Sequence, residues 1–204
     1  MSKVEKAFEA IAVRNVERVK HLIESGVDVN AADDWEGGSL LHRAAFEGYA
    51  PMVGMLIHKG ANVNAANNRG MTPLHMAVPS PCCHPSNDFG KVIKLLLEHG
   101  ADVNAATKPC KATPLHFAVS CLCDGWVVAL LLEHGADVDA LDGDGLKPIN
   151  HCFLNGDISD LLKEAKAKKD MKAQPQQSAQ PQPQQKKNPS GPSSGPSFTP
   201  AHLL

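Results

Sequence analysis

Three histidines at equivalent positions of a recurring phrase have the most evident potential for chemistry in this chain. His42, His75 and His116 lie in SLLHRAA, TPLHMAV and TPLHFAV, and imidazole serves both as a general base and as a metal ligand. If the three phrases form neighbouring helices, their histidines lie about 10 Å apart, the separation of packed helices. That distance is too large for shared ligation of one metal ion, so we expect no common metal site.

Cysteines and one further histidine form a second candidate site. Cys82, Cys83 and His84 are consecutive, and Cys121 and Cys123 follow in a later segment. Four soft ligands of this kind would suit tetrahedral Zn²⁺. The adjacent and Cys-x-Cys spacings nevertheless match the usual Cys-x-x-Cys zinc motif poorly. Two interpretations stay open here: a zinc- or redox-responsive site, and ordinary loop thiols without a metal.

Catalytic motifs are missing from the sequence. DGDG at residues 142–145 has two carboxylates, but the ligand pattern and closing glutamate of a calcium loop do not follow. A turn that uses glycines explains these residues better. The sequence also has no P-loop or kinase motif. We therefore expect a protein that is not an enzyme and has no cofactor, with zinc as the one open alternative.

A repeated pair of phrases organises most of the chain. GVDVNA, GANVNA, GADVNA and GADVDA begin at Gly26, Gly60, Gly100 and Gly135, at spacings of 34, 40 and 35 residues. Each of the first three is followed by one of the histidine phrases, and the fourth by KPINHCF. Two motifs that recur in phase with a period near 33 residues are typical of ankyrin repeats. The chain therefore resembles an ankyrin-repeat protein over roughly residues 4–165.

The resemblance implies an all-α repeat solenoid, with stacked helix-turn-helix repeats and β-turn fingers. In that family the histidine lies at the repeat junction and bonds the backbone of neighbouring fingers, which implies a structural role for these rings. The expected domain covers residues 1–169, in five repeats of which the first and last are divergent. The approximate repeats are 4–32, 33–66, 67–106, 107–141 and 142–169.

Local signals agree with this register. Thr72 is placed to cap a helix that Pro73 opens, and Gly60 and Gly100 close outer helices where a positive φ is tolerated. The third repeat carries an insert at 79–88, in which three prolines argue against a continuous helix. Stacking would bring this insert and its cysteines to the same edge as the turn that contains Cys121 and Cys123.

The end of the chain departs from the motif. In the fifth repeat Asn150 stands where the histidine would be, and we expect a shortened second helix that acts as the C-terminal cap. From about Asp170 to Leu204 the composition changes to Gln, Pro, Ser and Gly, with almost no aliphatic residues. Such a segment cannot offset the entropy of ordering, so 170–204 is predicted to be a disordered tail.

The composition limits which kinds of partner and which cellular compartment we expect. Residues 1–162 carry 13 Lys/Arg against 20 Asp/Glu, and an acidic domain argues against a nucleic-acid-binding groove. No apolar run approaches the roughly 20 residues of a membrane span, and the N-terminus has no signal-peptide core. We expect a monomer in the cytoplasm or nucleus, with reduced cysteines and no membrane or nucleic-acid partner.

The resemblance also implies a binding surface, because the finger tips and exposed inner helices of ankyrin proteins form a concave face that binds other proteins. Trp35 is either a contact on this face or folded back over its own finger, and Phe46 is either a concave contact or partly buried between helices. The residues expected on the face are Asp34, Trp35, Arg43, Asn68, Arg69, Met71, Met76, Lys108, Lys111, Phe117, Asp144, Leu146 and His151.

The main hypothesis from the sequence is thus a non-enzymatic protein-protein interaction module or adaptor that binds an unidentified protein through this concave face. One alternative is the zinc- or redox-responsive protein described above. The other is a docking subunit or inhibitor of a larger enzyme, with the Gln/Pro-rich tail as a tether.

Overall fold

The computed structural model describes residues 1–34, 36–78, 88–120, 125–152 and 156–173. Apart from one isolated bridge between Ala32 and Ser39, the regular elements in these ranges are helices. In chain order they are α1 (Lys3–Ala12), α2 (Val16–Glu24), α3 (Leu40–Phe46), α4 (Ala50–His58), α5 (Pro73–Ala77), α6 (Phe89–Glu98), α7 (Pro114–Ser120), α8 (Gly125–Glu133), the 3-10 helix η1 (Pro148–His151) and α9 (Gly156–Ala173).

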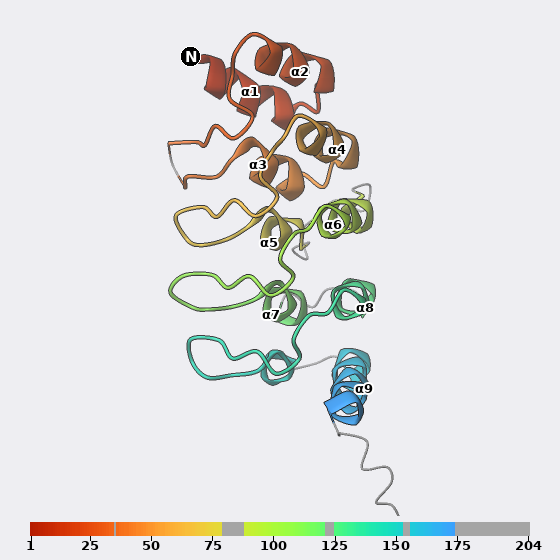
Figure 1. The fold of residues 1–204 in the computed structure, drawn as a ribbon. Helices are drawn as coiled ribbons and strands as arrows, with labels where there is room; N and C mark the ends of the chain where they lie inside the picture. Colours follow the sequence, from red (N-terminus) through yellow and green to blue (C-terminus); the bar gives the residue numbers. More distant parts are fainter. Residues whose placement is uncertain (35, 79–87, 121–124, 153–155, 174–204) are drawn as a thin grey trace, which may run out of the picture. The chain divides into compact units, whose positions relative to one another are not determined.

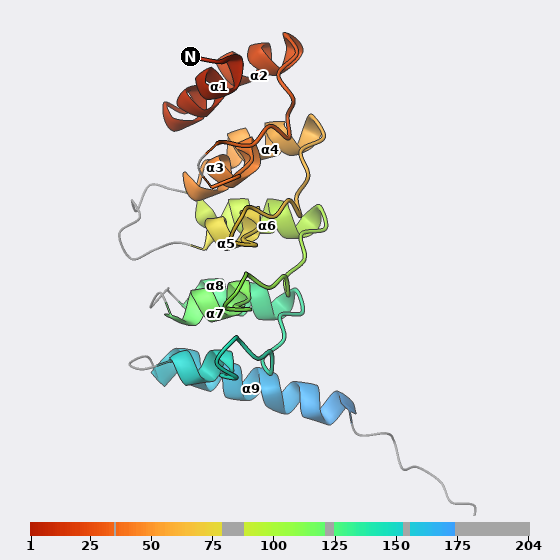
Figure 2. The same ribbon diagram turned by 90° about the vertical axis from the view of Figure 1, so that its left-hand side faces the viewer.

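The helices of residues 1–173 pair into successive layers of a stack (Figures 1 and 2). An inner row contains α1, α3, α5, α7 and η1, and an outer row contains α2, α4, α6, α8 and α9. Neighbouring inner helices pack on one another, as do α2 with α4, α4 with α6 and α8 with α9. This arrangement confirms the predicted all-α repeat solenoid.

Capping residues start the inner helices where the sequence predicts. Thr72 is the N-cap of α5, and its Oγ1 lies 2.9 Å from His75 Nδ1. Pro73 follows at the first helical position, where no backbone N–H partner is needed. At the other end of a repeat, Gly60 and Gly100 adopt φ values of 90° and 84° after the outer helices. Such values favour glycine, so the helices end there.

The core lies between the two helical rows and continues from layer to layer. Its largest fully buried side chains are mostly leucines and isoleucines supplied by both rows. No single helix pair encloses these side chains, because each layer covers the apolar face of the next. The largest of them include Leu40, Leu41, Leu56, Leu74, Ile93, Leu96, Leu115 and Leu131.

Loops between the inner and outer rows project beyond the inner helices (Figure 1). We call these loops fingers and number them along the chain: the first finger is 32–38, the second 66–71, the third 106–112 and the fourth 140–146.

Asparagines of the recurring VNA phrase link the loops that follow the outer helices. Asn64 Oδ1 accepts a hydrogen bond from the Asp102 N–H at 2.8 Å, and Asn64 Nδ2 donates to the Gly100 carbonyl at 2.8 Å. Asn104 makes the same pair of bonds to the next loop, at Asp137 N–H and Gly135 O. An asparagine suits this position because its amide can accept and donate toward the following repeat.

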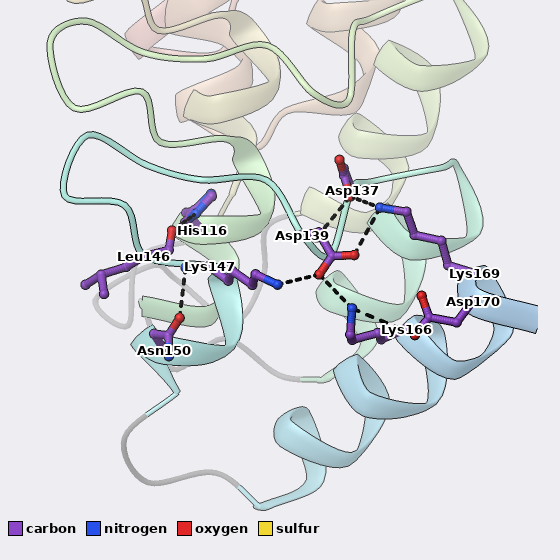
Figure 3. A network of polar contacts seen from close by, with 9 residues as sticks. All are labelled: His116, Asp137, Asp139, Leu146, Lys147, Asn150, Lys166, Lys169 and Asp170. Atoms are coloured by element: carbon purple, nitrogen blue, oxygen red, sulfur yellow. Dashed lines mark hydrogen bonds and ion pairs between the residues drawn. The ribbon is translucent and has the colours of Figure 1, made fainter. Parts of the chain in front are cut away.

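An aspartate replaces this asparagine in the last repeat. Asp139 accepts bonds from Lys147 and Lys166, each at 2.9 Å, and from Lys169 at 3.1 Å (Figure 3). Lys169 also reaches Asp137 at 2.6 Å. Beginning with Lys147, these bonds hold the pKa of Asp139 well below its usual range. The ammonium groups of Lys166 and Lys169 thus donate hydrogen bonds to Asp139, whereas in the earlier repeats a backbone N–H of the next loop donates to the equivalent asparagine.

The length of α9 differs from the prediction for the end of the domain. The sequence placed a shortened helix in the fifth repeat and ended the domain at 169, but α9 has 18 residues and extends to Ala173. Two of its lysines are held by Asp137 and Asp139, which favours a longer helix than an unattached end would form. Residues 174–204 of the predicted tail and 79–87 of the predicted insert lie outside the described residues.

The continuous core predicts a large effect for a leucine of α7. Leu115→Ala should lower the free energy of unfolding by about 2–5 kcal/mol, because Leu115 is fully buried and its truncation leaves a cavity. The matched control is Leu141→Ala, since Leu141 is 55% exposed and its truncation should change stability by less than about 0.5 kcal/mol. Urea titration would measure both, and equal losses would contradict this packing.

The lysine network predicts a salt-dependent effect at the last repeat. Asp139→Asn should lower the urea midpoint, because the amide keeps the shape but loses the charge that holds three lysines. The loss should shrink at 1 M NaCl, where charges are screened within about 3 Å. Asp160→Asn is the control, because Asp160 is exposed and pairs with Lys163 on the same helix. A salt-independent loss would show that the charge contributes nothing.

Candidate functional site

Backbone hydrogen bonds join the finger tips into a row. The Asn68 N–H donates to the Glu36 carbonyl at 2.9 Å, and the Lys108 N–H donates to the Arg69 carbonyl at 2.7 Å. The Gly143 N–H continues the row by donating to a carbonyl of the third finger at 2.6 Å. The fingers are so close that a Cβ on Gly70 would lie 2.9 Å from the Lys108 nitrogen. Each finger tip therefore has a defined position relative to its neighbours.

Buried histidines fix the fingers to the inner helices. Nε2 of His42 lies 2.9 Å from the Met71 carbonyl, and Nε2 of His75 and His116 lie 3.2 Å from carbonyls of the third and fourth fingers. Figure 3 shows His116 directed at Leu146. In each ring Nδ1 accepts an N–H from the residue three positions earlier, so the proton is on Nε2, which donates. The predicted structural role of these histidines is confirmed.

A hollow of about 220 Å³ lies between the first two fingers and the inner helices. Arg43 and Phe46 of α3 line it, and the Arg43 guanidinium lies 5.9 Å from the centre of the Phe46 ring. Phe46 is 49% exposed, so of its two sequence interpretations the concave position is the one observed. Met76 of α5 and the acidic residues Asp33 and Glu36 line the same hollow.

The predicted site residues that are described divide into two groups. Met71, Met76, Phe117 and His151 are partly buried, and the Phe117 ring meets the His75 ring edge-on at 5.5 Å between centroids. Trp35 lies outside the described residues. The exposed group is Asp34, Arg43, Asn68, Arg69, Lys108, Lys111, Asp144 and Leu146. Their role in binding stays a prediction.

A histidine-aspartate pair in the last repeat is absent from the sequence-based interpretation. His151 Nε2 lies 2.7 Å from Asp142 Oδ2, and Asp142 Oδ1 accepts the N–H groups of Asp144 and Leu146. The Leu146 N–H, and to a lesser extent His151, lower the pKa of Asp142. The sequence gives no signal for the pairing, because it depends on how η1 folds back onto the fourth finger.

This pair does not extend to a metal site. One ligand atom from each of His116, Asp142 and His151 lies within 4.8 Å of the others. His116 is already engaged on both ring nitrogens, by Thr113 and by Leu146, so it has no lone pair to offer a cation. The predicted zinc ligands Cys82, Cys83, His84, Cys121 and Cys123 lie outside the described residues, and zinc binding there stays a prediction.

Helix pairs are stacked in register, and α3, α5 and α7 each have a histidine bonded to the next finger. These features define a repeat solenoid. We call the hollow between the first two fingers and the inner helices the groove. A family model described as ankyrin repeats (three copies) matches residues 8–107 and 82–173. The chain belongs to the ankyrin-repeat family.

Similar proteins match part of this chain. The chain is 34% identical over 113 residues to the nuclear factor NF-kappa-B p105 subunit of Gallus gallus, a match that covers 54% of this chain and 11% of that protein. It is 37% identical over 101 residues to human ankyrin repeat and SOCS box protein 16, covering 50% of this chain and 20% of that protein. A putative ankyrin repeat protein of fowlpox virus is 50% identical over 66 residues, covering 32% and 12%. The chain therefore spans a fifth or less of these relatives.

Ankyrin repeats generally mediate protein-protein interaction through a concave surface, and repeats of this family are typically not enzymes. None of the helices in the described ranges combines the length and apolar composition that crossing a bilayer requires.

The buried histidines predict a loss of stability in mild acid. Burial lowers the pKa of His75 to about 4, and also lowers the pKa of His42 and His116. The unfolded chain takes up these protons below about pH 6.5, whereas the folded His75 stays neutral until about pH 4. Stability should therefore be complete above pH 6.5 and fall as the pH drops toward 4, by about 3 kcal/mol for His75.

Urea titrations of the wild type and His75→Asn at pH 7.5 and 4.5 would check this effect. Asparagine is a suitable replacement because Asn150 occupies the equivalent position and accepts the Lys147 N–H at 2.9 Å. The variant should be less stable at pH 7.5 but lose less on acidification. His21→Asn, at an exposed position of α2, should retain the wild-type pH dependence. The same pH dependence in all three proteins would contradict the assignment.

Proposed function

We propose that this chain is a non-enzymatic binding module that holds a segment of a partner protein in the groove between its fingers and inner helices. The observation that carries the proposal is the exposed pair of Phe46 and Arg43 above the hollow beside the first two fingers. An aromatic ring beside an arginine is a composition enriched at the energetic centres of protein interfaces. Phe46 leaves about half of its surface to solvent although the core beneath it is continuous.

The rigidity of the surface supports this proposal. Finger tips joined by backbone bonds, and tied to the inner helices through buried histidines, present their side chains without a large loss of entropy on binding. The chain spans a fifth or less of the relatives named above, so the proposal concerns the repeats and names no partner.

Affinity capture with a matched pair of variants tests the proposal. Arg43→Ala/Phe46→Ala removes an exposed cation and aromatic ring from the groove. Lys94→Ala/Trp126→Ala removes the same two chemical groups from the outer helices, where Trp126 is 43% exposed. Both variants should keep the wild-type circular dichroism, because the four side chains lie on the surface and none belongs to the buried core.

We expect a partner identified by mass spectrometry to be retained by the wild type and by the outer-helix variant. Its recovery on the groove variant should fall at least about tenfold, the effect of losing one hot-spot residue. Partners that survive the groove substitutions and disappear with the outer-helix substitutions would place the binding surface on the opposite row of helices and refute the proposal.

A further inference from the structure

Charges along the row of fingers are separated by sign. The first finger carries Asp33, Asp34 and Glu36, and the fourth carries Asp142 and Asp144. Between them the second and third fingers carry only cations, at Arg69, Lys108 and Lys111. We call these three residues the cationic centre. Because the tips are bonded in sequence along the stack, this centre lies between two acidic ends.

The cationic centre is exposed and weakly neutralised. Lys108 and Lys111 are exposed, and within the described ranges neither forms an ion pair. The side chain of Arg69 is 67% exposed, and its nearest carboxylate, Glu36, is 3.9 Å away. An exposed pair at that distance contributes at most a small stabilisation. The three charges are therefore open to a ligand.

Two of the cations are brought together by the close stacking of the fingers. The Lys108 N–H bonds to the Arg69 carbonyl, and the Lys108 Cγ lies 3.2 Å from the position that a Cβ on Gly70 would take. The lysine stem thus crosses the second finger next to Arg69. Lys111 adopts a φ of 50° and donates its N–H to Thr107, which closes the third finger on itself.

We propose that the cationic centre binds a short acidic stretch of the partner protein, with neutral or basic residues on both sides of that stretch. The inference rests on the proposed function, because the second finger, which carries Arg69, also lines the groove at Asn67. It adds the chemistry that the bound segment must have. Carboxylates opposite Arg69, Lys108 and Lys111 gain favourable charge interactions. Further acids toward either end would meet the carboxylates of the first or fourth finger, and repulsion between like charges disfavours them.

The acidic ends also favour a protein segment over a nucleic acid. A polynucleotide carries regularly spaced phosphates and affinity for it rises with the number of cations that contact them. Along this row of fingers a phosphate chain would extend beyond the cationic centre and pass the acidic first and fourth fingers. A protein segment can confine its negative charge to the middle.

Selection of random peptides on the full-length chain tests the proposal. A displayed library of 12-residue peptides would be selected on the wild type, on Lys108→Glu/Lys111→Glu, and on Lys20→Glu/Lys94→Glu. The last variant has the same change in net charge on exposed lysines of α2 and α6, both in the outer row. Circular dichroism would first show that all three proteins are folded.

Peptides selected on the wild type and on the outer-row variant should be at least twofold enriched in Asp and Glu at central positions. Selection on Lys108→Glu/Lys111→Glu should shift these positions to Lys and Arg. Synthetic wild-type peptides should bind that variant at least tenfold more weakly in fluorescence anisotropy, and the difference should shrink at 0.5 M NaCl. Acidic peptides that bind all three proteins equally would overturn the proposal, as would stronger binding of a labelled single-stranded RNA than of the peptides.

The outcomes separate this inference from the proposed function. If selected peptides lose affinity for Arg43→Ala/Phe46→Ala but carry no central acids, the groove binds protein and only the charge assignment fails. If they bind that variant as well as the wild type and bind Lys108→Glu/Lys111→Glu equally well, the groove itself is the wrong surface.

Discussion

The hydrogen bond from a buried histidine to the carbonyl of the next finger is the interaction on which this structure depends. In His42 the bond joins α3 to the second finger, and in His75 and His116 it joins later layers in the same way. Because each ring also accepts an N–H at the start of its own helix, one side chain couples a helix cap to the neighbouring repeat. Helix start, finger position and repeat stacking are thus set together.

Such a chain of contacts needs a defined end. The asparagines of the earlier repeats bond the loop of the following repeat, but α9 follows the last repeat. Asp139 stands at the equivalent position and accepts hydrogen bonds from Lys166 and Lys169 of α9. The same helix covers the last layer with Ile158 and Leu162. Polar and apolar groups of one helix therefore replace the two kinds of contact that a further repeat would make.

The fingers are held in place by hydrogen bonds while the side chains at their tips are exposed to solvent. The second, third and fourth fingers cannot shift independently, since each is bonded to the finger before it and to a histidine of an inner helix. Side chains at their tips are consequently held at fixed spacing while they stay in solvent. A surface of this kind can discriminate partners by the order of charges along it, because a partner cannot move an unfavourable finger aside.

The sequence by itself determined the repeat architecture and the inner and outer helices, because these depend on local spacing, caps and apolar periodicity. The structural role of the histidines was implied by the resemblance to ankyrin repeats. Tertiary structure alone decided the length of α9, the pairing of Asp142 with His151 and the exposure of Phe46. It also placed Lys166 and Lys169 on Asp139, 27 and 30 residues away. These features arise where stacked layers bring distant residues together, and the geometry of that contact is not encoded in any single repeat.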